Sequence, residues 1–512
     1  MTRVEAGAPP TAPARAAGIR WIPAAVAAVV LLALFLRLYR IGEASIDEDE
    51  GFSLMDAAWP PRGANRLRPV YYALLHAWML FGQSDGWLRS LAALMSVASV
   101  YLAYRLGARI LGPATGLVGA LVLALSPLSI MLAQMIRMYA PATSFALLGC
   151  LALLAFRDRP TWGRLLAWAA ARVVMLLTAP ATILLVPVDL ALAWRQLRER
   201  LPLLGSRVFL AASVAALAAP ALYVAKRMAG ASDTWYNEWV VQPGFWSLLS
   251  LPAMLTAYWY APYRYVEPHF PSSWLLWLFR LYTLALAGVI AAAVLGRGRR
   301  AAAPVLWWVG VPCAVFFVVS NLFVTLWVPR YLGFLAPFVA LAAAAGFARV
   351  AVGSRAVAGL FAALYLGTVG IALTRMYASP IQPDMRGAAA IIRANARPGD
   401  IVVGNVPGQV FARYLPGVRE HTLNMASNDD PLLRDPATGL TPPERAVRSL
   451  PATTGRIWIV FGQRPYFPRH TASGDRLREA LDRRYRVRLD HGLNRARLFL
   501  LEPRAPAQRD AS

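Results

Sequence analysis

The chain has 512 residues, of which 58% are apolar and only 15% are charged, and its mean hydropathy is +0.47. A soluble domain usually carries about 25% charged residues, so this composition excludes an ordinary soluble enzyme and also a disordered chain. The net charge of +25 comes almost wholly from arginine, because Lys226 is the only lysine. These arginines stand between apolar runs, which favours contact with anionic lipid head groups over nucleic acid. We therefore predict a mainly α-helical, polytopic membrane protein.

Eleven apolar runs approach the ~20 residues that a helix needs to cross the hydrocarbon core of a bilayer. No signal-peptide cleavage site precedes Arg37, so the first run is interpreted as a retained span. Residues 1–20, rich in Ala and Pro, are expected to be a disordered cytoplasmic N-terminus. The predicted spans are 21–37, 87–104, 115–133, 141–156, 165–178, 180–194, 208–225, 273–295, 304–327, 332–348 and 356–376.

Arginines in alternate connectors predict the orientation of these spans. The positive-inside rule places the arginine-bearing connectors in the cytoplasm, and they carry Arg105, Arg109, Arg157, Arg159, Arg164, Arg195, Arg198, Arg200, Arg297, Arg299, Arg300, Arg349 and Arg355. The first outer loop (38–86), residues 134–140, the loop at 226–272, the bend at 328–331 and the chain after Tyr377 then face outward. Since the use of arginine suggests a GC-rich bacterial genome, we expect a multi-pass protein of the bacterial inner (plasma) membrane, its N-terminus cytoplasmic and its C-terminus extracytoplasmic.

The last part of the chain has a different composition from the membrane part, residues 21–376. From Asp384 onward it holds 13 of the 27 acidic residues, and its apolar segments are short. We predict that residues 377–512 form a small extracytoplasmic α/β domain that covers the site or recognises an acceptor. Its expected elements are helices at 386–396 and 474–485 and strands at 400–406, 456–461 and 495–502.

Four consecutive carboxylates, Asp47-Glu48-Asp49-Glu50, follow the first span on its outer side. Like charges packed together repel one another, which costs free energy unless a cation or a reaction uses them. A solvated acidic loop tip is the simpler interpretation, but Phe52 and Trp59 return the chain at once to apolar and aromatic sequence. Glycan transfer needs a carboxylate that takes the proton of an acceptor hydroxyl, and this loop offers one.

Basic residues at the outer ends of the spans are candidates for binding an anionic phosphate. Snorkelling and aromatic-belt anchoring explain each of them singly, but outward-facing cations run against the positive-inside bias. Together with the acidic loop they predict a lipid-phosphate site. The candidates, with their neighbouring tyrosines, are Arg68 and Tyr72, Arg137 and Tyr139, Lys226 and Arg227, and Arg330 and Tyr331.

These motifs resemble those of the GT-C glycosyltransferases, in the branch that contains protein O-mannosyltransferases and lipid A aminoarabinose transferases. The resemblance covers nearly the whole membrane part and is dense over residues 45–140. It rests on Asp49-Glu50-Gly51-Phe52-Ser53, Arg68-Pro69-Val70-Tyr71-Tyr72 with the Ala73–Trp78 helix, Phe81-Gly82-Gln83-Ser84 with Leu88-Arg89, Ser126-Pro127, Arg137-Met138-Tyr139, Arg330-Tyr331 with Pro337, and Asp384–Ala389.

The resemblance implies a polyprenyl monophosphate-linked sugar as donor and a catalytic pair, Asp49 as the base with Glu50 beside it. Asp47-Glu48 offers a competing register, and Asp47 and Tyr72 are expected to contact substrate. The chain has Arg68-Pro69-Val70 where family members usually have Lys or His before two prolines.

No cofactor is predicted, and a metal site has no support. Family members often carry a His after Leu-Thr at the end of span five, but here Leu177-Thr178 is followed by Ala179. Glu267 and His269 lie two residues apart in the long outer loop, a spacing that chance alone explains. The Trp and Tyr residues between 235 and 260 predict an interfacial helix pair in the same loop.

We therefore predict an integral-membrane glycosyltransferase that moves a hexosyl or pentosyl group from the lipid-linked donor to an acceptor hydroxyl on the outer face. The partners implied are the donor, a glycan, lipid or protein acceptor, and membrane lipids. Arg68, Arg137 and Arg330 would stabilise the leaving phosphate. Two alternatives stay open: a lipid or glycan transporter, for which only Arg172 and Asp189 are mid-membrane candidates, and a non-enzymatic scaffold.

Overall fold

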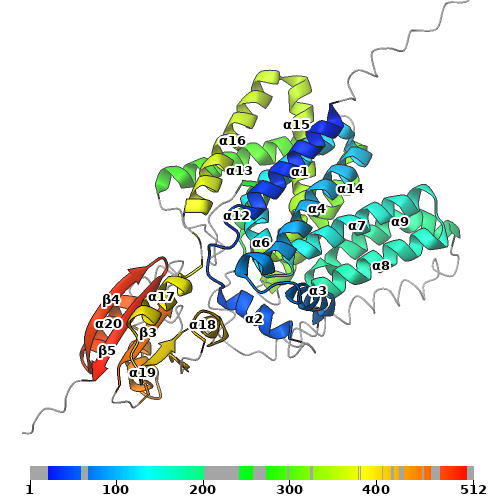
Figure 1. The fold of residues 1–512 in the computed structure, drawn as a ribbon. Coiled ribbons are helices and arrows are strands. Elements are labelled where there is room, and N and C mark those ends of the chain that lie inside the picture. Colours follow the sequence, from blue (N-terminus) through cyan, green and yellow to red (C-terminus); the bar gives the residue numbers. More distant parts are fainter. Residues whose placement is uncertain are drawn as a thin grey trace, which may run out of the picture.

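A helical bundle with a small α/β region at one end makes up the fold (Figure 1). The structure is a computed structural model that describes residues 21–58, 67–200, 242–257, 272–296, 299–322, 327–378, 380, 382–405, 408–416, 420–425, 432–451, 455–462 and 473–503. The predicted disordered N-terminus, the span at 208–225 and the candidates Lys226, Arg227, Glu267 and His269 lie outside these ranges.

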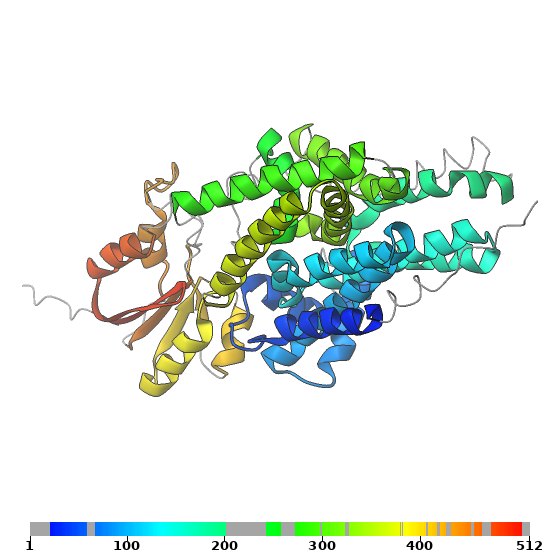
Figure 2. The same cartoon turned by 90° about the horizontal axis from the view of Figure 1, so that it is seen from above.

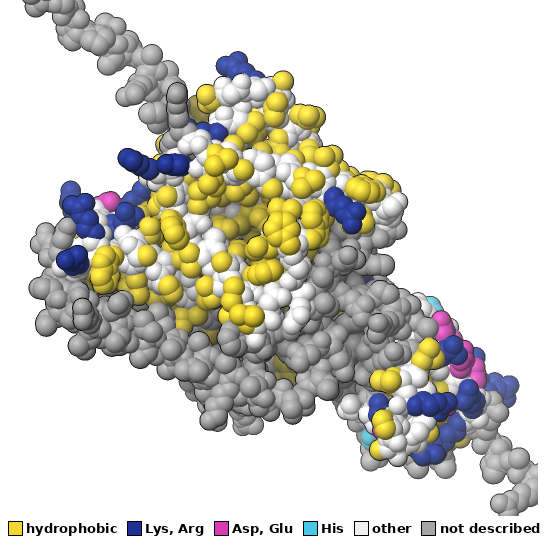
Figure 3. Space-filling model, turned by 180° about the vertical axis from the view of Figure 1, so that it is seen from behind, with side chains coloured by type: hydrophobic (Ala, Val, Ile, Leu, Met, Phe, Trp, Pro, Cys, Tyr) yellow, Lys and Arg dark blue, Asp and Glu magenta, His cyan; other side chains and the backbone are white. Residues whose placement is uncertain are grey.

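Every predicted span within the described residues coincides with a helix or with two successive helices. In the part of the chain that the structure describes, six helices are long and apolar enough to cross a membrane, or seven spans if one bent pair counts as one, so the total of eleven stays a prediction. The bundle consists of α1 (Ile22–Leu38), α4 (Asp85–Leu111), α5 (Pro113–Leu125), α6 (Pro127–Ala133), α7 (Tyr139–Asp158), α8 (Trp162–Thr178), η3 (Pro180–Leu184), α9 (Leu185–Arg200), α12 (Phe245–Ala257), α13 (Ser273–Leu295), α14 (Arg299–Leu322), η4 (Pro329–Leu335), α15 (Ala336–Gly353) and α16 (Arg355–Ala378). Hydrophobic side chains dominate one broad face of the bundle (Figure 3).

The span predicted at 115–133 is broken into α5 and α6, which are bent by 61°. Pro127 has no N–H to donate, so the helix cannot continue its ladder through this point. The buried guanidinium of Arg37 in α1 fills the gap by donating to the carbonyls of Leu123 at 3.2 Å and Ala124 at 3.0 Å. Ser126 caps α6 and donates to the carbonyl of Leu255 in α12 at 2.8 Å. The break therefore sets the direction of the chain that follows α6.

The connectors predicted to be cytoplasmic and those predicted to face outward lie at opposite ends of the bundle. At one end Arg109 of α4 pairs with Asp158 of α7, and the side chain of Arg349 lies beside Gly296. At the other end the first outer loop meets the connector between α6 and α7 and the start of η4. The grouping of these segments agrees with the sequence prediction, whereas their sidedness in a membrane stays a prediction.

The acidic run is not a loop tip, because it forms the first turn of a helix, α2 (Glu48–Asp56). Asp47 is the N-cap, and a capping box joins it to Glu50. Carboxylates are stabilised in the first turn, where the backbone N–H groups point outward. A second short helix, α3 (Pro69–Met79), begins with a proline at its first position and completes the loop.

The long outer loop contributes α12, which packs into the bundle against α6, α13 and α15. Its side chains Leu251, Met254 and Leu255 are buried. The described part of the loop is therefore a core helix, whereas the aromatic residues that predict the interfacial pair lie, apart from Trp246, outside the described residues.

The C-terminal α/β region, residues 382–503, contains a five-stranded sheet in the order β2-β1-β3-β5-β4. The first three of these are parallel, and β5 and β4 add antiparallel strands. The elements are α17 (Met385–Asn395), β1 (Ile401–Gly404), α18 (Gly408–Tyr414), β2 (Glu420–Thr422), α19 (Pro442–Arg448), β3 (Ile457–Gly462), α20 (Ser473–Asp482), β4 (Tyr485–Leu493) and β5 (Ala496–Pro503). Each predicted element is present, but the helix expected at 474–485 ends at Asp482 and β4 follows it.

Alternate residues of the central strands enter two different cores, which is why these strands are apolar throughout. Val402, Val460 and Leu498 join the large core that is continuous with the bundle. Val403, Ile459 and Phe499 face a second core that α19 and α20 cover. The first core therefore fixes the C-terminal region against one end of the bundle (Figure 2).

Candidate active site

Asp49 lies between two arginines that come from distant parts of the chain. Its Oδ2 accepts a hydrogen bond from Arg330 Nη1 at 2.9 Å, and its Oδ1 is 3.9 Å from Arg137 Nη2. Arg137 Nη1 also donates to the backbone carbonyl of Asp49 at 2.9 Å and to Ser53 Oγ at 3.1 Å. The Asp49 side chain is 31% exposed, but those of Arg137 and Arg330 are 12% and 9% exposed. A ligand can therefore reach the carboxylate while the two cations are held in place.

The capping box at the start of α2 decides which carboxylate points at these cations. Asp47 Oδ1 accepts from the backbone N–H of Glu50 at 2.8 Å, and Glu50 Oε2 accepts from that of Asp47 at 3.1 Å. Asp47 is thereby committed to capping, and Asp49 is the member of the run that faces both arginines. This geometry supports the Asp49 register over the Asp47 register.

Glu50 is fully buried and ties three segments together. Arg89 of α4 donates to its Oε1 from Nε at 2.8 Å and to its Oε2 from Nη2 at 2.7 Å. The backbone N–H of Ile136 donates to Oε1 at 2.9 Å. With every lone pair engaged, Glu50 is suited to position Asp49 and Arg137 rather than to share the catalytic role expected from the sequence. Arg89, which appeared only in a motif, is the partner that the sequence alone did not identify.

Tyrosines and a third arginine surround this centre. The guanidinium of Arg330 lies 5.4 Å from the ring centre of Tyr331, whose ring is 6.4 Å from that of Tyr139. Burial raises the pKa of the Tyr72 hydroxyl, and the charges of Arg137 and Arg68 oppose that rise. Arg68, at the N-cap of α3, therefore lies within electrostatic reach of the site, although no described contact joins it to Asp49.

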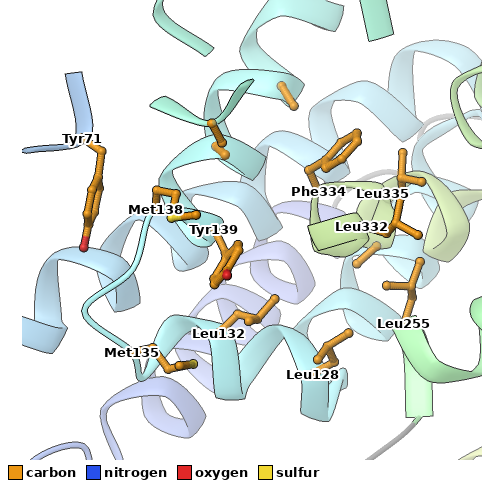
Figure 4. Close-up of a cluster of buried hydrophobic side chains, with 14 of the residues drawn as sticks. Tyr71, Leu128, Leu132, Met135, Met138, Tyr139, Leu255, Leu332, Phe334 and Leu335 are labelled. Atoms are coloured by element: carbon orange, nitrogen blue, oxygen red, sulfur yellow. The ribbon is translucent and has the colours of Figure 1, made fainter. Parts of the chain in front are cut away.

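Buried donors that lack an acceptor among the described residues gather here, and they include the hydroxyls of Tyr72 and Tyr139 and Nε of Arg137. Tyr139 points from the start of α7 into the layer where η4 packs on α6 through Leu332 and Leu335 (Figure 4). Burial alone would lower the pKa of Arg137, but the carboxylate of Asp49 raises it above its usual value. A buried donor without an acceptor costs free energy. An anion that entered beside the guanidinium of Arg137 would supply the missing acceptor, so these donors fit an anion-binding site.

The described residues contain no group of three or more His, Cys, Asp or Glu side chains that could hold a metal ion.

The two mid-membrane candidates for a transport path pair with each other. Arg172 Nε donates to Asp189 Oδ2 at 2.6 Å, and both side chains are buried. The indole N–H groups of Trp168 and Trp308 also donate to Asp189, at 2.8 and 2.9 Å. Because these partners engage both oxygens of the carboxylate, the pair is best explained as a structural link among α8, α9 and α14.

Asp189→Asn is expected to lower stability by about 3 kcal/mol, because it leaves the charge of Arg172 buried without a counter-ion. The measurement is thermal unfolding in lipid nanodiscs. Arg172→Met with Asp189→Leu should recover much of the loss, since removing both charges leaves neither uncompensated. A stable single variant would mean that water reaches the pair.

Residues 69–223 match a family model described as dolichyl-phosphate-mannose-protein mannosyltransferase. A search of curated proteins gives no significant match. Among solved structures, the chain is similar to ArnT from Cupriavidus metallidurans bound to undecaprenyl phosphate, with a TM-score of 0.51 at 16% identity over 95% of this chain and 98% of that one. It is also similar to the Archaeoglobus fulgidus oligosaccharyltransferase tethered to an acceptor peptide, with a TM-score of 0.53 at 12% identity over 96% and 75%. At such identities these similarities show the fold, and they extend over the bundle and the C-terminal α/β region.

Proposed function

We propose that this chain, which has the fold of the GT-C membrane glycosyltransferases, transfers a sugar from a polyprenyl-phosphate carrier to an acceptor hydroxyl, with Asp49 as the base. The observation that carries the proposal is the placement of Asp49 between Arg137 and Arg330 at one end of a membrane-type bundle. The similarity to ArnT bound to undecaprenyl phosphate and the match to a family model described as dolichyl-phosphate-mannose-protein mannosyltransferase both support a lipid phosphate as the leaving group.

The proposed reaction is a single displacement. Asp49 takes the proton of the acceptor hydroxyl while the oxygen attacks the anomeric carbon of the sugar. The bond between that carbon and the phosphate oxygen breaks, and the lipid phosphate leaves with an added negative charge. Arg137 and Arg330 face that charge, and the Tyr139 hydroxyl adds an uncharged donor.

The ion pairs of Asp49 with Arg137 and Arg330 also have a role in this scheme. The arginines keep the Asp49 carboxylate in its ionised form, which is the form that a base requires. When a donor phosphate enters, it competes with Asp49 for the same guanidinium groups, so Asp49 loses part of its pairing. The carboxylate is then freer to accept a proton at the stage at which the acceptor must be deprotonated.

The test is turnover by the purified chain in lipid nanodiscs. A panel of radiolabelled undecaprenyl-phosphate sugars, each carrying one hexose or pentose, is incubated with the protein, and release of undecaprenyl phosphate is measured. Turnover of at least one donor is expected. If no donor is turned over and undecaprenyl phosphate itself does not bind, the proposed function is wrong.

A lipid or glycan transporter is the competing function. Transporters place ionisable side chains along a mid-membrane path, whereas the described candidates, Arg172 and Asp189, pair with each other in the core of the bundle. Movement of a fluorescent polyprenyl-phosphate sugar across vesicles containing the protein, without any transfer, would favour that alternative.

We place the site on the outer face, where nucleotide sugars do not reach and a carrier-linked donor is needed. Reporter fusions after Ser512 and within the connector at 297–300 are expected to lie on opposite sides, the first outside and the second in the cytoplasm. Activity of alkaline phosphatase and fluorescence of a green fluorescent protein at each point give the measurement. A cytoplasmic reporter after Ser512 would contradict the assignment.

A further inference from the structure

One buried carboxylate links the C-terminal α/β region to the membrane bundle. Asp85, the first residue of α4, accepts hydrogen bonds from Arg386 Nη2 at 2.6 Å, Arg413 Nε at 2.7 Å and Tyr414 Oη at 2.6 Å. All three donors belong to α17 and α18, and Asp85 is 7% exposed. Hydrogen bonds to an ionised, buried carboxylate are strong ones, so this contact joins the two parts firmly.

Two of these residues, Arg386 and Tyr414, also hold the segment that leads into α2. The hydroxyl of Tyr414 accepts from the backbone N–H of Ile46 at 2.8 Å, and the backbone N–H of Arg386 donates to Ser45 Oγ at 3.0 Å. Burial and the hydrogen bond to Asp85 raise the pKa of Tyr414 to about 12, so its hydroxyl keeps its proton over the physiological range. The C-terminal region thus fixes the chain at the residues immediately before the capping box of α2.

A third contact lies against α2 itself. A Cβ atom added at Gly51 would be 2.7 Å from Cγ2 of Val410 in α18, which is the single atom that it would meet within 4 Å outside α2 itself among the described residues. Gly51 stands two positions after Asp49, and the preceding Glu50 is held by Arg89. The helix that carries Asp49 is therefore held by α4 through Glu50 and by α18 at Gly51.

We infer that α18, joined to the bundle through Asp85, is a positioning element for Asp49. On this view the C-terminal region is part of the catalytic unit even though Val410, Arg413, Tyr414 and Asp85 touch neither the base nor the phosphate site. The expected effect on the rate of transfer rests on the proposed function. The structural expectation does not, because it says only that α2 becomes more mobile when the hydrogen bonds of Asp85 are removed.

The first experiment compares Asp85→Asn and the milder Tyr414→Phe with the wild type in nanodiscs. We expect kcat to fall about tenfold, since small displacements of a catalytic group cost one to two orders of magnitude, while the affinity for undecaprenyl phosphate stays unchanged. Hydrogen–deuterium exchange of the α2 amides should become faster in both variants. Glu502→Gln, which removes an exposed ion pair with Arg488 in the same region, is the matched control and should change none of these.

The second experiment tests the contact between Gly51 and Val410 by compensation. Gly51→Ala should lower kcat about tenfold by pushing α18 away from α2, and Val410→Ala alone should have a small effect. Because Val410 Cγ2 is the atom in the way, the double variant should recover a rate near that of Val410→Ala. A double variant as slow as Gly51→Ala would overturn the inference, since the defect would then be local to α2.

The exchange measurement separates failure of this inference from failure of the proposed function. If α2 exchanges faster in Asp85→Asn but the wild type neither turns over a donor nor binds undecaprenyl phosphate, the link stands and the proposed function fails. If the wild type turns over a donor and Asp85→Asn matches it in both rate and exchange, the proposed function stands and the positioning role is wrong.

Discussion

Purified Asp49→Asn protein is expected to lose at least ~100-fold of its transfer rate, which is the usual contribution of a general base. Asparagine has the shape of aspartate and can still accept a hydrogen bond from Arg330, but it cannot take the acceptor proton. The fold should therefore be unchanged. The affinity for undecaprenyl phosphate should be unchanged or higher, because a carboxylate no longer competes with the phosphate for Arg137 and Arg330. The measurements are single-turnover transfer and binding of undecaprenyl phosphate, both in nanodiscs.

Two neighbouring carboxylates provide the controls for this variant. Asp47→Asn should be mild, since asparagine is as good an N-cap as aspartate. Glu50→Gln should reduce stability as well as rate, because it leaves the buried charge of Arg89 without its counter-ion. A rate for Asp49→Asn above roughly a tenth of the wild-type rate would be too high for the loss of a general base and would contradict the assignment.

Arg330→Ala is expected to weaken donor binding and to slow transfer, together by about 30-fold. A hydrogen bond to a charged group contributes ~2 kcal/mol. Because 1.4 kcal/mol corresponds to a factor of ten, the loss of this bond corresponds to about 30-fold. Arg330→Lys should recover only part of the loss, because lysine presents a point charge where the planar guanidinium can hold two oxygens at once. Donor-dependent kinetics of both variants in matched lipid give the measurement.

Arg299→Ala is the matched control for this series. Arg299 begins α14 at the end of the bundle away from Asp49, and its side chain is exposed. Its removal should leave kcat and the donor dependence unchanged. Equal, small effects at Arg330 and Arg299 would mean that Arg330 only anchors the chain at the head-group level, and the phosphate site would then have to be sought near Lys226 and Arg227.

The position of Asp49, Arg137 and Arg330 at the same end of the bundle could be predicted from span parity, whereas their direct contacts could not. Each residue ends or follows a span on the same side, so counting apolar runs and arginine-rich connectors was enough to place the three at one end. The pairing of Glu50 with Arg89 could not be predicted in this way. It depends on the rotation of α2 against α4, and the acidic run carries no periodicity that reveals which carboxylate points inward.

The features missed in the C-terminal region and in the third span are those with the weakest local signals. Helix α18 has seven residues between stretches of sequence that contain glycine and proline, and it is too short to show a hydrophobic period. Strand β4 carries Arg486 and Arg488 at alternate positions. These polar residues resemble those of the preceding helix, so the sequence showed no clear boundary between the helix and the strand. Ser126-Pro127 was visible as a motif, but the break at Pro127 is stabilised by Arg37, a residue almost ninety positions earlier in the chain.

That bond between Arg37 and the broken span has a consequence for the order in which the protein is made. During synthesis α1 enters the membrane well before α5, so the guanidinium arrives while the carbonyls of Leu123 and Ala124 do not yet exist. Until they do, a charge near the end of α1 is best kept at the lipid–water boundary, where Arg37 can extend its side chain to the head groups. Arg37 can be buried only once the bent pair has been inserted beside α1. Final seating of the first helix is therefore a late event in biogenesis, and a nascent chain halted before residue 123 would hold α1 shallower than the finished protein does.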